Sequence, residues 1–119
     1  MRTITERVDR GEAVLDRRDP GWWREDAMPA IDLETLDLAD GDKCILGQRC
    51  PLELRGGRDG AHSGYDRYSR HLSRKPLAMD ADWWAVRHGF QAFSDNLGGE
   101  YEELAAEWAR RIRARRDAA

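Results

Sequence analysis

Two tryptophan doublets, Trp22-Trp23 and Trp83-Trp84, constrain the fold of this chain more than any other feature of its sequence. Leu, Ile, Val and Phe together make up only 20 of the 119 residues, a fraction typical of disordered chains when the net charge is also high. The formal net charge here is only −3. Because a buried indole removes about 150–250 Å² from water, the tryptophans can supply the core of one small domain.

Length and residue pattern predict a single domain over residues 1–119. A chain of 119 residues is close to the commonest domain size. Its apolar residues recur at helical spacing in several segments, and no second alternating run is available for a strand to pair with. We therefore expect an all-α fold of about five or six helices, in which three longer helices pack around short helical segments.

The first and last helices are predicted from clear apolar stripes. Over Ile4–Arg18, apolar residues follow one helical face, and Gly11 on that face would let another helix approach closely. Over Gly99–Arg116, acidic residues come first and arginines last, which complements the helix dipole. Trp108 lies centrally in the apolar stripe of this last helix, so we expect it in the core.

The helix expected over Asp80–Gly89 decides which indole of the second doublet is buried. A stripe through Trp83, Val86 and Phe90 would place Trp83 in the core. Trp84 follows at about 100° around the helix and would lie at the margin of the core. The sequence therefore predicts a buried Trp83 and an exposed Trp84.

Shorter elements are expected between these helices. An aspartate precedes each of two short helices, predicted over Leu33–Leu38 and Lys43–Gln48, as a candidate N-cap. A further helix is expected over Tyr65–Ser73. The Gly/Arg-rich loop at about residues 53–64 is expected to be flexible, because glycines raise the entropic cost of ordering a segment.

The sequence contains no residue pattern typical of a catalytic or metal site. Cys44, Cys50, His62 and His71 lack the close spacing with which one turn presents two ligands to zinc. The glycine-rich loop has no Gly-Lys-Ser/Thr for phosphate, and no serine lies in a nucleophile elbow. We therefore expect no metal and no cofactor, and a small hydrolase or metal enzyme is the least favoured alternative.

The chain is expected to act in the cytoplasm, without contact to a membrane. Its start is charged rather than apolar, and no apolar run approaches the length of about 18 residues that a membrane span needs. Cys44 and Cys50 would stay reduced in that compartment. Oligomeric state is left open by the sequence.

Indoles and arginines expected at the surface are the candidate binding residues. Trp23 and Trp84, each the second member of its doublet, would be exposed aromatics bordered by charge, which is typical of interface anchors. Arg110 and Arg113 point away from the apolar stripe of the last helix. We expect these four side chains to contact a protein partner.

The charge pattern also allows a nucleic-acid interface. Residues 26–42 carry six acidic side chains and no basic one, whereas residues 43–75 carry eight basic and three acidic. The two segments would either neutralise each other or form a surface of two signs. The arginines that would contact nucleic acid are Arg110, Arg113, Arg116, Arg67, Arg70 and Arg74.

Three short motifs carry a resemblance to a known group of proteins. Cys44-Ile-Leu-Gly-Gln48, His88-Gly-Phe90 and Tyr101-x-x-Leu-x-x-x-Trp108 occur in this order. In these motifs and in its Arg-rich last helix, the chain resembles small uncharacterised proteins of actinobacteria and their phages. The resemblance implies a biological setting and no particular activity.

The sequence therefore predicts a non-catalytic protein-interaction module, such as a phage-type inhibitor or accessory factor that acts on a host protein. Spare indoles, opposed charges and the lack of a catalytic pattern favour this function. A nucleic-acid-binding or transcription-associated module, using the last helix and the basic loop, is the alternative. Binding that weakens steeply with salt would indicate nucleic acid.

Overall fold

The computed structural model describes residues 2–54, 63–93 and 99–119, and the regular secondary structure in these residues is helical. Within these residues there is no strand, so the predicted all-α class is confirmed. Four of the α-helices are ten residues or longer, one more than predicted. The elements are α1 (Ile4–Arg18), α2 (Ile45–Arg49), the 3-10 helix η1 (Leu52–Leu54), α3 (Gly64–Ser73), α4 (Ala78–Arg87) and α5 (Glu100–Ala118).

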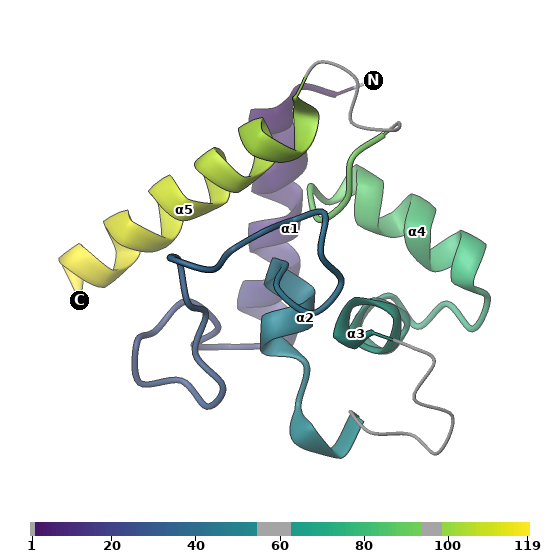
Figure 1. Ribbon diagram of the computed structural model, residues 1–119, viewed down its shortest axis with the longest axis horizontal. Coiled ribbons are helices and arrows are strands. Elements are labelled where there is room, and N and C mark those ends of the chain that lie inside the picture. The colour runs from purple at the N-terminus through teal and green to yellow at the C-terminus, as the bar shows by residue number, and fades with distance from the viewer. Residues whose placement is uncertain (1, 55–62, 94–98) are drawn as a thin grey trace.

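The central element is α1, which lies between α5 on one side and α4 on the other (Figure 1). The shorter α2 packs against α3, and α3 packs in turn against α4. The segment that joins α1 to α2 crosses in front of α1 in Figure 1. Its residues Ile31 and Leu38 are buried and close the core from this side.

α1 forms as its sequence predicts. The hydroxyl of Thr3 accepts a hydrogen bond from the backbone N–H of Glu6 at 3.1 Å and caps the first turn. Val8 and Leu15 are fully buried. A Cβ on Gly11 would collide with the carbonyl oxygen of His88 and lie 2.9 Å from a ring carbon of Trp108, so the predicted close approach at this glycine is confirmed.

Three aromatic rings occupy the centre of the core. Trp108 is fully buried, as predicted, and it stacks on Phe90 with ring centroids 5.2 Å apart. Trp22 meets Trp108 edge to face at 5.6 Å. The indole N–H of Trp108 donates to the carbonyl of Gly89 at 2.7 Å, which satisfies a polar group that burial would otherwise leave unpaired.

The doublet on α4 is turned the opposite way from the prediction. Trp84 is buried, with 8% of its surface exposed, whereas Trp83 is 51% exposed. Val86 and Phe90 of the predicted stripe are buried, but α4 directs Ala81, Trp84 and Ala85 inward with them instead of Trp83. The indole of Trp84 stacks on Phe90 at 5.6 Å. The predicted burial of Trp83 and exposure of Trp84 are therefore wrong, because two small alanines rather than Trp83 face the neighbouring helices.

The helix predicted over Leu33–Leu38 does not form. The segment makes consecutive turns, in which an aspartate carboxylate accepts a hydrogen bond from the backbone N–H two residues later. Such bonds offer the backbone an alternative to helical pairing. The three donor–acceptor pairs are Glu34 to Asp32 at 3.0 Å, Ala39 to Asp37 at 3.0 Å and Asp42 to Asp40 at 2.9 Å.

The starts of α2 and α4 differ from those predicted from the sequence. Cys44 rather than Asp42 caps α2, and its Sγ accepts from the N–H of Gly47 at 3.2 Å. The carboxylate of Asp42 accepts instead from the N–H of Gly64 at 2.9 Å, at the start of α3. α4 begins at Ala78, without a side-chain cap.

The predicted flexible loop falls mainly on residues 55–62, outside the described part of the chain. At its two borders, Leu52–Leu54 forms the 3-10 helix η1, and the hydroxyl of Ser63 caps α3 by accepting from Asp66 N–H at 3.3 Å.

Candidate protein-interaction surface

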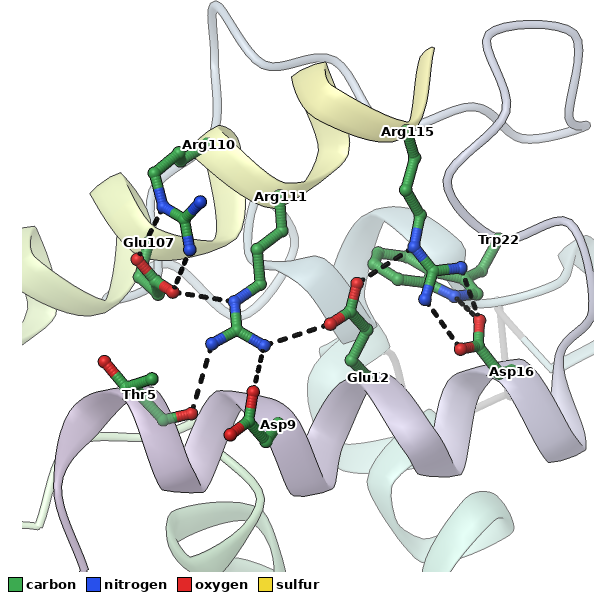
Figure 2. Close-up of polar contacts among 9 residues, drawn as sticks. All are labelled: Thr5, Asp9, Glu12, Asp16, Trp22, Glu107, Arg110, Arg111 and Arg115. Atoms are coloured by element: carbon green, nitrogen blue, oxygen red, sulfur yellow. Dashed lines mark hydrogen bonds and ion pairs between the residues drawn. The ribbon is translucent and has the colours of Figure 1, made fainter. Parts of the chain in front are cut away.

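Arginines of α5 join that helix to α1 through an ion-pair network (Figure 2). The guanidinium of Arg111 lies 2.6 Å from Asp9, 3.0 Å from Glu12 and 2.7 Å from Glu107. Arg115 contacts Glu12 at 2.9 Å. Both arginines are therefore paired with carboxylates of α1, and these ion pairs hold α5 against α1.

The two α5 arginines chosen from the sequence do point outward. The side chain of Arg110 is 65% exposed and pairs with Glu107 on the same helix at 2.7 Å (Figure 2). Arg113 is exposed and makes no hydrogen bond or ion pair with any residue that the structure describes. Their direction is as predicted, and a binding role for them stays a prediction.

Trp23 is half-buried between arginine side chains. The guanidinium of Arg24 lies 5.8 Å from its ring centroid and that of Arg115 lies 6.0 Å away. Its carbonyl accepts from Arg116 at 2.8 Å, and Arg116 also donates to the carbonyl of Ile31 at 2.7 Å. Arg116 therefore ties the end of α5 to the segment after α1.

The six arginines proposed for nucleic acid lie on two separate helices. α5 packs on α1, whereas α3 packs on α2 and α4, and the two helices lie in different parts of Figure 1. On α3, Arg67 and Arg70 are half-buried, and Arg74 is exposed in a left-handed conformation at the helix end, with φ 60°. The structure thus gives no single surface that contains all six.

An exposed aromatic pair that the sequence analysis missed lies at α4. Trp83 and Phe93 are each 51% exposed, and their ring centroids are 6.0 Å apart with planes tilted by 55°. Met79, one helical turn before Trp83, is 72% exposed. Exposed hydrophobic side chains usually occur singly, so a group of large ones at the surface is unusual.

Polar contacts with Glu100 and the buried Arg7 fix the position of Phe93. Its backbone N–H donates to the carboxylate of Glu100 at 2.5 Å. That carboxylate lies 3.1 Å from the buried guanidinium of Arg7, which also donates to the carbonyls of Val86 at 2.8 Å and Gln91 at 2.7 Å. One buried arginine on α1 thus joins the end of α4, the start of α5 and the segment that carries Phe93.

Basic side chains border the aromatic pair. A hollow of about 330 Å³ beside Trp83 is lined by Arg2, Arg7, Trp83, Val86 and Arg87. Arg2 and Arg87 are exposed. We call Met79, Trp83, Phe93, Arg2 and Arg87 the Trp83 surface.

The small residues of α4 were the signal that could have located this surface. Ala81, Trp84 and Ala85 also follow helical spacing, at i, i+3 and i+4, as the predicted stripe of Trp83, Val86 and Phe90 does at i, i+3 and i+7. Alanine permits a close helix contact, so the stripe with two alanines was the better candidate for the buried face.

The two cysteines are buried, and they form no disulfide with each other. Burial raises the pKa of the Cys44 thiol to about 12, which keeps it protonated. Across residues 2–54, 63–93 and 99–119, no group of three or more His, Cys, Asp or Glu is placed to hold a metal ion.

Comparison with protein-family models, with curated proteins and with solved structures finds no match for this chain. Among the described helices, none has both the length and the apolar character that crossing a membrane requires.

Proposed function

We propose that this protein is a non-catalytic protein-interaction module that binds its partner through the Trp83 surface. The observation that carries the proposal is the contact between two half-exposed aromatic rings, Trp83 and Phe93. Tryptophan is among the residues that most often dominate binding energy at protein interfaces. A partner that covers both rings would remove their apolar area from water, which favours association.

The charged residues at the border of the Trp83 surface indicate the chemistry of the partner. Arg2 and Arg87 are exposed next to Trp83 and have no ion pair with a described residue. Interfaces combine an apolar centre with a polar rim of complementary charge. We infer a partner segment with an apolar or aromatic side chain flanked by carboxylates.

The surface is already in place before binding. Trp84, the residue that follows Trp83, is buried, and its burial fixes the orientation of α4. Arg7 and Glu100 hold the backbone of Phe93. Little side-chain entropy would therefore be lost at these residues when the partner binds. We propose the role of a cytoplasmic inhibitor or accessory factor, of the phage type, that acts on another protein.

Affinity capture with two matched variants tests this function. Tagged wild type, Trp83→Ala and Arg113→Ala proteins are incubated with lysate of the source cells, and the captured proteins are quantified by mass spectrometry. Arg113, which the sequence predicted to contact the partner, lies exposed on α5, away from α4 (Figure 1), so its variant distinguishes the Trp83 surface from the α5 arginines. We expect a discrete protein to bind wild type and Arg113→Ala and to be lost with Trp83→Ala.

Direct binding of the captured protein, purified, then confirms or rejects the surface. Phe93→Ala should weaken that binding as Trp83→Ala does, since the two rings form one contact area. Equal binding by wild type and Trp83→Ala would show that the partner uses another surface.

A further inference from the structure

The arginines in the described part of the chain form two groups, those that contact a carboxylate and those that do not. Arg49, for example, is buried against Asp19 at 2.6 Å, and the arginines of the α1–α5 network are paired as well (Figure 2). Arginines with no ion pair to any described residue include Arg10, Arg17, Arg74 and Arg87. Arg113 on α5 has no such ion pair either, but these four belong to α1, α4 and the C-cap of α3.

The charges of α1 point to two different sides of that helix. Its carboxylates contact the arginines of α5 (Figure 2). Arg10 and Arg17 are seven residues apart, which corresponds to about two helical turns, so they share one side. That side is the one near His88, which follows α4.

Positive charge is concentrated around His88. Burial lowers the pKa of this imidazole, and the nearby guanidiniums of Arg10, Arg87 and Arg17 lower it further, against the opposing effect of a hydrogen bond to the carbonyl of Trp84. A cation lowers the pKa of a histidine only when its field reaches the ring. The three arginines therefore contribute to one region of positive potential.

This region continues into a cleft between the ends of α1 and α3. The cleft has a volume of about 310 Å³, and its lining includes a single aliphatic side chain, Leu72. Arg18 donates to the carbonyl of Leu72 and bridges the two helix ends. The polar residues that line the cleft are Arg17, Arg18, His71 and Arg74. Together with Arg10 and Arg87, which lie near His88, they form what we call the basic face, and Arg87 also borders the Trp83 surface.

The chemistry of the basic face differs from that of the Trp83 surface. Protein interfaces usually have an apolar centre with few charges, which Trp83 and Phe93 provide and the basic face does not. Interfaces with nucleic acids are more polar and much more positively charged. Guanidinium groups also match the geometry of phosphate oxygens.

We propose that the basic face binds the sugar–phosphate backbone of a nucleic acid. The site goes beyond the protein-binding function, and it lies on α1, α3 and α4 rather than on the α5 arginines. Because the whole chain carries a net charge of −3, the rest of the molecule adds no net attraction for a polyanion. Binding is therefore of modest strength, independent of base sequence and sensitive to salt.

Fluorescence anisotropy with labelled oligonucleotides of about 20 nucleotides, single-stranded and duplex, tests the site over a range of salt concentrations. The variants are Arg17→Gln and Arg74→Gln, whose side chains make no bond to a described residue. Arg113→Gln removes the same charge on α5, where the sequence predicted a nucleic-acid contact, so this variant distinguishes the basic face from the α5 arginines. Circular dichroism verifies that all three variants stay folded.

We expect each basic-face variant to weaken binding by about fivefold or more at low salt and to reduce the slope of log K against log salt by about 0.7–0.9. Arg113→Gln should change neither. Absence of binding by the wild type at low salt, or an equal loss with Arg113→Gln, would overturn the site. Competition by polyglutamate as strong as that by unlabelled oligonucleotide would assign the face to an acidic protein instead. None of these results depends on the protein partner of the Trp83 surface.

Discussion

Gly11 is the residue at which the packing of the fold is tightest. It lies on the buried side of α1, where the carbonyl of His88 and the ring of Trp108 approach its Cα. Glycine costs about 1 kcal/mol relative to alanine in a helix. The close contact of α1 with the end of α4 and with α5 offsets this cost.

Gly11→Ala should destabilise the protein although it improves helix propensity. The added methyl group overlaps the His88 carbonyl and the Trp108 ring, and overpacking of this kind costs about 1–3 kcal/mol. Urea unfolding followed by circular dichroism measures the change. Ala13→Gly, at an exposed position on the same helix, is the control and should cost only about 1 kcal/mol through propensity. A Gly11→Ala protein as stable as wild type would contradict the packing.

Residue spacing predicted the buried faces of α1 and α5, but not that of α4. In α1 and α5 one stripe is apolar and the opposite side is charged, so only one orientation buries the apolar side chains. In α4 both Trp83 and Trp84 lie on candidate stripes. The orientation of α4 depends on where the neighbouring helices leave room for an indole. Residue spacing along one helix carries no information about that room.

At the scale of elements, the α1–α5 pair is held by charge as well as by apolar contacts. Arg111 links the two helices, and Glu107, on the same helix as Arg111, supports it: Arg110 and Arg111 both bind the Glu107 carboxylate (Figure 2). Hydrogen bonds from Arg110 above all, and from Arg111, lower the pKa of Glu107 to about 2, although partial burial acts in the other direction.

Acid should remove the contribution of Glu107 to stability. Because its pKa is lower in the folded protein than in the unfolded chain, where it is about 4.3, the contribution is complete above about pH 4.3 and disappears as the pH falls towards 2. Melting temperatures of wild type and Glu107→Gln measure this. The variant should melt lower at neutral pH, and the two curves should converge in acid. Curves that stay parallel between these pH values would show that Glu107 is not stabilised by the arginines.

The positions of the α-helices were predictable, and the structure of the segment governed by local polar bonds was not. The five described α-helices begin and end within about two residues of their predicted ranges. The segment before α2 forms turns because Asp32, Asp37 and Asp40 bind nearby backbone N–H groups. Aspartate is both an N-cap and a turn residue, so its presence alone did not distinguish a helix from consecutive turns.

At the scale of the whole molecule, paired charge, unpaired charge and exposed aromatic area occupy different parts of the described structure. Carboxylates and arginines pair between α1 and α5. Several arginines without ion pairs to a described residue lie near His88 and at the ends of α1 and α3. Trp83 and Phe93 share an exposed contact, and Arg87 borders both of these last two regions. The sequence predicted an aromatic core and a surface of indoles and arginines. It did not predict which residues form that surface, because tertiary contacts select them.

The central claim is that the second doublet separates into a core residue, Trp84, and a surface residue, Trp83. The most direct test compares the free energies of unfolding of Trp83→Ala and Trp84→Ala, obtained from urea titrations followed by circular dichroism. Trp84→Ala should lose about 3–5 kcal/mol, as large-to-small core substitutions do. Trp83→Ala should lose less than about 1 kcal/mol, as surface substitutions do. A larger loss for Trp83→Ala than for Trp84→Ala would contradict the account.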